Sequence, residues 1–343
     1  MKNLILSYLL GCLLVTGCRT PKSGTSNVAQ QKPVTTIAFG SCSRQSLPQP
    51  LWDDVVAQKP DVWIWLGDNI YGDSENMDTL RAKYAMQKAN PVYQQLRQSA
   101  SIIGVWDDHD YGVNDGGKEY PKRKESQQVM LDFLDVPTTS PLRTQEGTYS
   151  AHVYGPKGKR VKVILLDARY FRDPLKKGGA DGKTNVADPS GDMLGETQWK
   201  WLEQQLTNSD ADVHIIGSGV QVIPNDHIYE KWGNFPTSRQ RLLDLISKTK
   251  PKGAFFISGD RHIAEVSKLN LPGLPYDLFD ITSSGLTHVG KPREEKNQYR
   301  VGEVVFKLNY GLVTINWDAK PLTAAVRING DEGATYLTQE LKF

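Results

Sequence analysis

The sequence VWIWLGD at residues 62–68 is an apolar run that ends on a carboxylate, and this pattern occurs twice more. The second run is IIGVWDDHD at residues 102–110, and the third is AFFISGDRH at residues 254–262. Continuous apolar runs rich in Val and Ile are typical of strands covered on both faces of a sheet. If such strands lie side by side, the carboxylates and imidazoles at their ends meet at one edge, as a dinuclear metal centre requires. This pattern favours a hydrolase.

Further apolar runs predict strands at residues 35–40, 148–154, 161–166 and 213–222. Helical patterns lie between the strands, at residues 51–58, 77–86, 91–98, 124–133, 197–206 and 238–248. The tail has a different pattern, which predicts consecutive hairpin strands at residues 304–308, 312–317, 324–328 and 336–341. We therefore expect an α/β chain with a β-rich C-terminal tail, in which two packed sheets are flanked by helices and the metal site lies at one edge.

The overall composition sets limits on size and on partners. A chain of 343 residues is long enough to bury a large core, and no obvious linker divides it. It carries 41 basic and 39 acidic residues, for a formal net charge of +2, so no field of one sign indicates nucleic acid. The sequence contains no recognisable nucleic-acid-binding module, and no protein partner is evident from it.

The N-terminus has the pattern of a bacterial lipoprotein signal at residues 1–18. An apolar stretch at residues 4–15 is followed by VTGC, which resembles a lipobox and makes Cys18 the expected site of lipidation. The alternatives are a plain secretory signal and a spanning helix, but the run is too short to span a bilayer. We expect residues 19–33 to form a flexible tether to a domain at residues 34–343. This predicts a protein held at the membrane by its lipid in the bacterial cell envelope, facing the periplasm or the cell surface.

Three cysteines occur in the chain, and the signal accounts for two of them. Cys12 leaves with the signal peptide and Cys18 takes the lipid, so Cys42 has no partner for a disulfide. Cys42 is therefore an inert buried thiol, a metal ligand or a nucleophile. Because it follows the predicted strand at residues 35–40, as the carboxylates follow theirs, we favour the metal ligand.

Asp68 is the natural candidate for a carboxylate that bridges two ions, because Gly67 lets the backbone turn sharply at the strand end. The alternative role for Asp68 is a helix N-cap. Asp260 and His262 are two positions apart, so on extended backbone both side chains would point to the same side and could chelate one ion.

The turn Asp107-Asp108-His109-Asp110 follows a predicted buried strand and concentrates negative charge, which only cations or protons would relieve. One of its aspartates can bind metal, and His109 can donate a proton to a leaving oxygen. Asp110 can orient the His109 ring and hold its proton. The alternative is an acidic turn that caps the following segment.

An ordered set of motifs covers the chain from about residue 37 to residue 311. The motifs are Gly40-Ser41-Cys42, Gly67-Asp68-Asn69-Ile70-Tyr71, Arg81-Ala82-Lys83-Tyr84, Trp106-Asp107-Asp108-His109-Asp110-Tyr111-Gly112, Leu166-Asp167-Ala168-Arg169, Trp199 with Leu202, and Gly259-Asp260-Arg261-His262. Together they resemble the alkaline phosphatase D (PhoD-like) family of calcineurin-like metallophosphoesterases. The resemblance implies the metallophosphoesterase-type fold, a two-sheet β-sandwich flanked by helices (αββα).

The resemblance also implies an active site that uses iron and calcium to hydrolyse phosphate monoesters and diesters. The implied metal ligands are Cys42, Asp68, Tyr84, Asp108, Asp260 and His262. Cys42 and Tyr84 would bind the ferric ion, and Asp68 would bridge. His109 would contact the phosphoryl or leaving group. The ligand types alone would also suit manganese or zinc at some positions.

Several assignments leave an alternative open. Tyr71 competes with Tyr84 as the phenolate, and Asp107 competes with Asp108 as the ligand. Arg169 would either clamp a phosphate with two hydrogen bonds or form a salt bridge.

The remaining polar residues of interest lie outside the motifs that hold the expected ligands. Asn114, Asp115 and Lys118 would line the mouth of the site, or their loop simply makes a turn. The histidines expected to be structural are His152, His214 and His288. His227 follows the predicted strand that ends near residue 222 and is the further candidate to reach the cleft.

Two other functions are also consistent with the sequence. One is a metallohydrolase specific for a carbohydrate or lipid phosphodiester, which would keep every ligand and differ only in the cleft. The other is a non-catalytic surface-binding lipoprotein that keeps the fold, against which the intact ligand set argues.

Overall fold

The computed structural model describes residues 32–179, 182 and 184–343. The predicted signal peptide, the lipidation site Cys18 and nearly all of the predicted tether lie outside the described residues. Within the described part of the chain, no helix is both long and apolar enough to cross a membrane.

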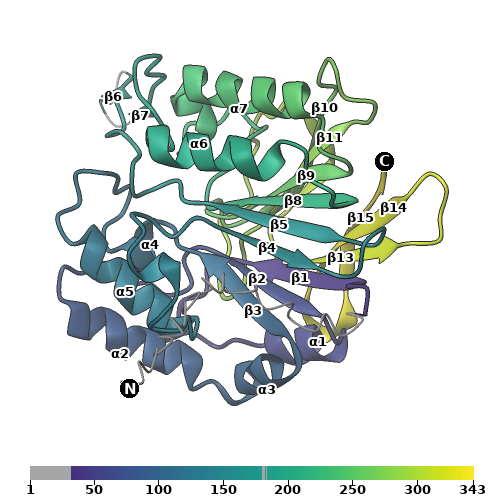
Figure 1. Cartoon of the computed structure of the whole chain (residues 1–343). Coiled ribbons are helices and arrows are strands. Elements are labelled where there is room, and N and C mark those ends of the chain that lie inside the picture. Colours follow the sequence, from purple (N-terminus) through teal and green to yellow (C-terminus); the bar gives the residue numbers. More distant parts are fainter. Residues whose placement is uncertain (1–31, 180–181, 183) are drawn as a thin grey trace, which may run out of the picture.

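Two large β-sheets pack face to face (Figure 1). The strand order in the first sheet is β15 (Thr335–Lys342), β14 (Thr323–Asn329), β13 (Tyr310–Asn316), β1 (Thr36–Gly40), β2 (Val62–Leu66) and β3 (Ser101–Val105). The order in the second sheet is β12 (Arg300–Val305), β10 (Ala264–Leu269), β11 (Leu278–Ser283), β9 (Ala254–Ser258), β8 (Val213–Ser218), β5 (Val161–Leu166) and β4 (Ser150–Tyr154). Strands β1, β2 and β3 are parallel, as are β5, β8, β9 and β11.

Helices cover the two outer faces of the sandwich (Figure 1). The helices on the first sheet are α1 (Leu51–Ala57), α2 (Met77–Lys88), α3 (Pro91–Ser99) and α5 (Arg123–Phe133), and those on the second are α6 (Gly195–Leu206) and α7 (Pro236–Thr249). A single-turn helix, α4 (Asp108–Tyr111), follows β3, and a small hairpin joins β6 (Lys177–Gly178) to β7 (Thr184–Asn185). This arrangement confirms the predicted αββα fold.

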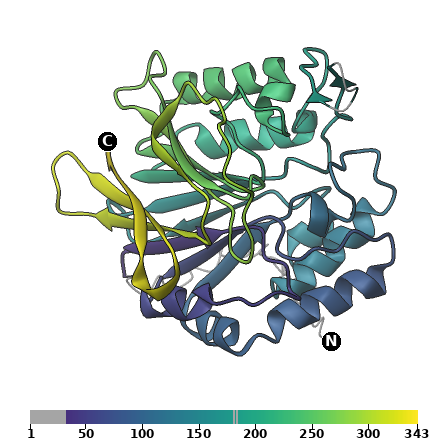
Figure 2. The ribbon, with the colours of Figure 1, turned by 180° about the vertical axis from the view of Figure 1, so that it is seen from behind.

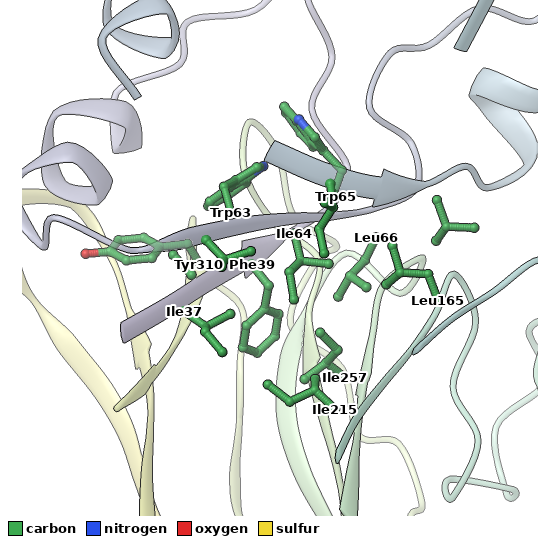
Figure 3. Close-up of a cluster of buried hydrophobic side chains, with 14 of the residues drawn as sticks. Ile37, Phe39, Trp63, Ile64, Trp65, Leu66, Leu165, Ile215, Ile257 and Tyr310 are labelled. Atoms are coloured by element: carbon green, nitrogen blue, oxygen red, sulfur yellow. The ribbon is translucent and has the colours of Figure 1, made fainter. Parts of the chain in front are cut away.

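Strand β2 shows why the run at residues 62–66 is apolar throughout. Successive side chains of a strand point to opposite faces of the sheet, and both faces are covered here. Ile64 and Leu66 point toward the second sheet, whereas Trp63 and Trp65 lie on the opposite face (Figure 3). On that face Trp52 of α1 packs edge-on against both tryptophans, with ring centroids 4.9 and 5.4 Å away. The packing buries every residue of β2.

The C-terminal tail differs from the prediction in one respect. Strands β13, β14 and β15 form consecutive hairpins in the first sheet, as predicted (Figure 2). The segment predicted at residues 304–308 corresponds to β12, which pairs with β10 in the second sheet and not with β13. The chain therefore crosses between sheets after β12, and a pattern of apolar stretches and turns does not reveal which sheet a strand joins.

Candidate metal centre

Five of the predicted ligands follow strands whose carboxyl ends meet at one edge of the sandwich. Cys42, Asp68 and Asp108 follow β1, β2 and β3, which run parallel to one another in the first sheet. Asp260 and His262 follow β9, in the second sheet. The centre is therefore built from both layers of the fold.

The side chains form three overlapping groups among the described residues. The groups are Cys42 with Asp68 and His262, Asp68 with Asp108 and His109, and Asp107 with Asp108 and Asp260. Within each group the potential ligand atoms lie within 4.8 Å of one another. Because Asp68 belongs to two groups, its carboxylate is placed where it can touch two ions.

Gly67 makes the turn that directs Asp68 into this centre. Its φ angle is 91°, which L side chains rarely adopt, and a Cβ there would lie 2.3 Å from the Cβ of Asp107. Only glycine fits this close approach between the ends of β2 and β3.

Four of the candidate ligands have a left-handed backbone although none of them is glycine. Their φ angles are 60° at Cys42, 49° at Asp68, 70° at Asp260 and 54° at His262. Such conformations cost roughly 1–3 kcal/mol each and occur preferentially at functional sites. Strain at these four positions points to a function for the side chains.

Burial and mutual repulsion oppose the ionised state of most acids in this cluster, whereas Arg169 and His109 outweigh burial at Asp108 and lower its pKa to about 2. Burial, followed by the nearby Asp108, raises the pKa of Asp68 well above its ordinary value and that of Asp260 to about 8. Burial also raises the pKa of Asp107 and, with Asp68, that of the Cys42 thiol. Buried acids that repel one another are stabilised by cations, so the donor set fits a metal centre.

The imidazole of His262 is already in the form that binds metal. Burial, with the neighbouring His288 and His109, lowers the pKa of His262 to about 4. The ring is therefore neutral at physiological pH and can use a nitrogen lone pair as a ligand.

The structure places Tyr71, not Tyr84, beside the Cys42 and His262 group. The Tyr71 hydroxyl lies 3.0 Å from Nε2 of His262 and 2.9 Å from Nε2 of His288. The Tyr84 hydroxyl instead donates a hydrogen bond of 3.1 Å to Oδ2 of Asp110. The alternative phenolate of the sequence analysis therefore has the better position, and Tyr84 supports Asp110.

Asp110 does not orient the His109 ring as predicted. Its carboxylate is buried and accepts hydrogen bonds from the Asp107 backbone at 2.7 Å and from Nδ2 of Asn69 at 2.6 Å. Nδ1 of His109 instead contacts Oδ1 of Asp73 at 2.7 Å. Asp110 thus fixes the turn around the ligands, and Asp73 orients the histidine.

Arg169 also differs from the expected phosphate clamp. Its side chain is 0% exposed, and Nε donates to Oδ1 of Asp107 at 2.6 Å. Its Nη1 donates to Oε2 of Glu230 at 2.7 Å. The Asp107 carboxylate is therefore occupied by Arg169. This bond explains why Asp108, and not Asp107, lines the cleft.

Replacing Arg169 with methionine should destabilise the fold by about 3–5 kcal/mol, because Asp107 would be left buried without its counter-charge and Glu230 would keep only Arg172. Thermal unfolding measured by calorimetry checks this expectation. Arg81→Met is the matched control, since Arg81 pairs with Asp78 on the surface, where such a pair contributes about 0–1 kcal/mol. Equal melting temperatures for the two variants would contradict the structural role of Arg169.

A cleft of about 460 Å³ opens over the centre. Its lining residues are Asp68, Asp108, His109, Asn114, Asp115, Lys177, Thr184, Asn185, Ile228, Tyr229, Glu230, Asp260, Arg261, His262, Gly290 and Arg293. Asn114 and Asp115 thus lie at the mouth, as predicted, whereas Lys118 forms a salt bridge with Asp173 instead.

The other histidines divide between structural and site positions. His214 and His152 have ordinary structural partners: His214 contacts the Lys252 carbonyl at 2.7 Å and His152 contacts Ser150 at 3.0 Å. His227 is buried but does not line the cleft. His288 was expected to be structural, yet its ring centroid lies 4.4 Å from that of His262.

Sequence reasoning missed Asp73 and His288 for different reasons. His288 follows β11, a strand that was not predicted. Its position near a strand end could therefore not be inferred from the sequence. Asp73 lies close to the motif that ends at Tyr71, and its proximity to Asp68 was the only signal available.

Comparisons with known proteins agree with this fold. A family model described as "PhoD-like phosphatase" matches residues 37–298. Comparison with curated proteins gave no match. A solved structure of PhoD superposes with a TM-score of 0.73 at 17% identity, covering 91% of this chain and 69% of that one.

Two further solved structures have the same fold. Purple acid phosphatase PPD1 from yellow lupin (Lupinus luteus) seeds has a TM-score of 0.63 at 13% identity, covering 91% of this chain and 54% of that chain. GAP50, described as the anchor in the inner membrane complex of Plasmodium, has a TM-score of 0.59 at 12% identity, with coverages of 91% and 90%.

Proposed function

The chain belongs to the PhoD-like phosphatase family, and from this premise we propose that it hydrolyses phosphate esters, including diesters, at a centre of two or more metal ions. The single observation that supports two ions is that Asp68 is grouped with Cys42 and His262 and also with Asp108, which in turn is grouped with Asp260. A carboxylate shared in this way is the usual means of holding two ions close together.

The chemistry of the donors suits two kinds of cation. The thiol of Cys42 and the phenol of Tyr71, with His262 and Asp68, would hold an acidic ion such as ferric iron. Asp108 and Asp260 are carboxylates and would hold a hard ion such as calcium. Manganese or zinc would also be accepted by these ligand types.

When bound, the ions would activate a water molecule and neutralise the phosphoryl oxygens. His109 lines the cleft and is the group that would protonate the leaving oxygen. Burial lowers its pKa, but the hydrogen bond to Asp73 and the charge of Asp108 outweigh burial and raise the pKa above the ordinary value. This shift favours the protonated form that an acid catalyst needs.

Hydrolysis is tested with bis-p-nitrophenyl phosphate and p-nitrophenyl phosphate, together with metal analysis of the purified protein. We expect metal-dependent release of p-nitrophenol, and a Cys42→Ala variant that loses iron and most of the rate. A metal-loaded protein that cleaves neither ester would overturn the proposal and favour a binding protein with this fold. Full iron and full rate in Cys42→Ala would show that the thiol is not a ligand.

Tyr71→Phe should lower the metal content and reduce kcat about 10- to 100-fold, a size typical of perturbed metal sites. Tyr84→Phe is the matched control, because it removes only the hydrogen bond to Asp110 and should keep the metal. Metal analysis and kinetics on bis-p-nitrophenyl phosphate, carried out on both variants, distinguish the two candidate phenolates. Loss of metal from Tyr84→Phe alone would restore Tyr84 as the phenolate.

Asp73→Asn should reduce kcat by about 10- to 100-fold for esters of poor leaving groups and much less for p-nitrophenyl esters, which need little protonation. The physical reason is that Asp73 holds the ring and the proton of His109 through the 2.7 Å contact. Comparing ethyl phosphate with p-nitrophenyl phosphate checks this expectation. An equal loss on both substrates would assign Asp73 a merely structural role.

A further inference from the structure

Two adjacent exposed hydrophobic side chains lie in the cleft itself. Ile228 is 59% exposed and Tyr229 is 39% exposed, and both line the cleft over the metal centre. Large apolar side chains in a cleft otherwise lined by charged and polar groups are typical of a surface that binds part of a ligand.

The Tyr229 ring is fixed in position by two guanidinium groups. The Cζ atoms of Arg261 and Arg293 lie 4.2 and 4.9 Å from the ring centroid. Both arginines also bind Glu295, with Arg293 at 3.1 Å and Arg261 in a closer contact. A ring held this way loses little additional conformational entropy when a ligand packs on its exposed surface.

The same contacts tie the ring to the metal centre. Arg261 lies between the candidate ligands Asp260 and His262 and is itself buried. Through Arg261, the Tyr229 ring is therefore linked to the segment that carries Asp260 and His262. A side chain anchored next to the candidate ligands is well placed to contact the organic part of a bound ester.

The cleft has room for an organic group beyond the phosphoryl group. Its volume of about 460 Å³ falls within the range of about 300–1,000 Å³ typical of sites that enclose small organic ligands. Polar side chains also line the cleft, among them Asn114, Lys177 and Asn185, and Lys177 binds both Asp115 and Asn185. A long alkyl chain would remove these polar groups from water, whereas a single compact aromatic ring can pack on Tyr229.

We propose that Tyr229, with Ile228, is the platform that binds the organic part of the substrate, and that it selects phosphate esters carrying an aromatic ring. The proposal deepens the proposed function, on which it rests for the position of the phosphoryl group. Tyr229 is thus a specificity residue, and Arg261 and Arg293 position it.

Two phosphonates that are not hydrolysed test the platform on the metal-loaded protein. Benzylphosphonate and ethylphosphonate share the same anionic group and differ in the aromatic ring. Calorimetric titration should show benzylphosphonate binding about tenfold more tightly, equivalent to ~1.4 kcal/mol and within the range for stacking on an aromatic side chain. Tyr229→Ala should reduce this preference to about twofold or less, and Tyr229→Phe should keep it.

The control variant is Met86→Ala, an exposed apolar residue on α2 that does not line the cleft and should leave the preference unchanged. Equal affinity of the wild-type protein for the two phosphonates, or a preference that survives in Tyr229→Ala, would overturn the platform. This failure is distinct from failure of the proposed function, which is a metal-loaded wild-type protein that hydrolyses no p-nitrophenyl ester.

Discussion

Asp68→Asn is expected to reduce kcat/KM for bis-p-nitrophenyl phosphate by about 10³-fold or more, equivalent to ~4 kcal/mol of transition-state stabilisation. The carboxylate of Asp68 belongs to two candidate ligand groups, so an amide in its place would weaken both of the proposed ion positions at once. Steady-state kinetics and metal analysis of the same preparation measure the loss of rate and of metal together.

The same variant should not be destabilised when it is free of metal. Asn carries no charge to repel Asp108, and it adopts the left-handed backbone of position 68 more readily than most residues. We therefore expect the metal-free Asp68→Asn protein to melt at or above the temperature of the metal-free wild type. Asp78→Asn is the control for both measurements, because Asp78 is 88% exposed and lies outside the cleft. Retention of full activity in Asp68→Asn would remove the bridging carboxylate from the mechanism.

Removal of metal by a chelator should abolish hydrolysis and lower the melting temperature by several degrees, since ions that bind only the folded state stabilise it. The effect should depend on pH. Burial raises the pKa of Asp260 to about 8 and that of Asp110 to about 7, against an ordinary value of 3.8. The folded protein then holds protons that the unfolded chain has already lost.

The sign of this pH dependence follows from proton linkage. Where the folded state binds more protons than the unfolded state, the free energy of unfolding falls as pH rises. The contribution of Asp110 and Asp260 is therefore complete below about pH 4 and is lost as pH rises to about 8. Calorimetry from pH 5 to pH 8 should show the metal-free protein losing stability over this window and the metal-loaded protein losing less. Parallel curves for the two forms would contradict a cation among these carboxylates.

The sequence predicted the central part of the fold because its strands are buried on both faces. Continuous apolar runs mark β1, β2, β3, β5, β8 and β9, and each predicted position overlaps the strand found. The same runs placed Cys42, Asp68, Asp108, Asp260 and His262 at strand ends, which is enough to predict that they meet. Parallel pairing brings Cys42, Asp68 and Asp108 together, whereas Asp260 and His262 reach them through the packing of the second sheet on the first.

Strands β10 and β11 were missed because buried charges interrupt their apolar pattern. Glu265 in β10 is neutralised by Arg300 at 2.7 Å, and Asp280 in β11 accepts a hydrogen bond from Ser258 at 2.7 Å. These partners come from other strands, so only the folded chain shows that the two acids can be buried.

The details of the site also depend on contacts between distant segments. Whether Arg169 meets a phosphate or Asp107 depends on how β5 lies against β3, and no local pattern contains that information. The choice between Tyr71 and Tyr84 likewise depends on which hydroxyl reaches His262. Side-chain types could be predicted from the sequence, whereas their partners could not.

The left-handed backbone at positions 42, 68, 260 and 262 affects which amino-acid substitutions would stabilise this protein. Glycine at any of these positions would relieve backbone strain, so selection or engineering for thermostability alone would favour losing the ligands. A descendant freed from catalysis should therefore accumulate glycine or asparagine there early. Cysteine, aspartate and histidine at such unfavourable positions therefore mark a chain in which the proposed chemistry outweighs backbone stability.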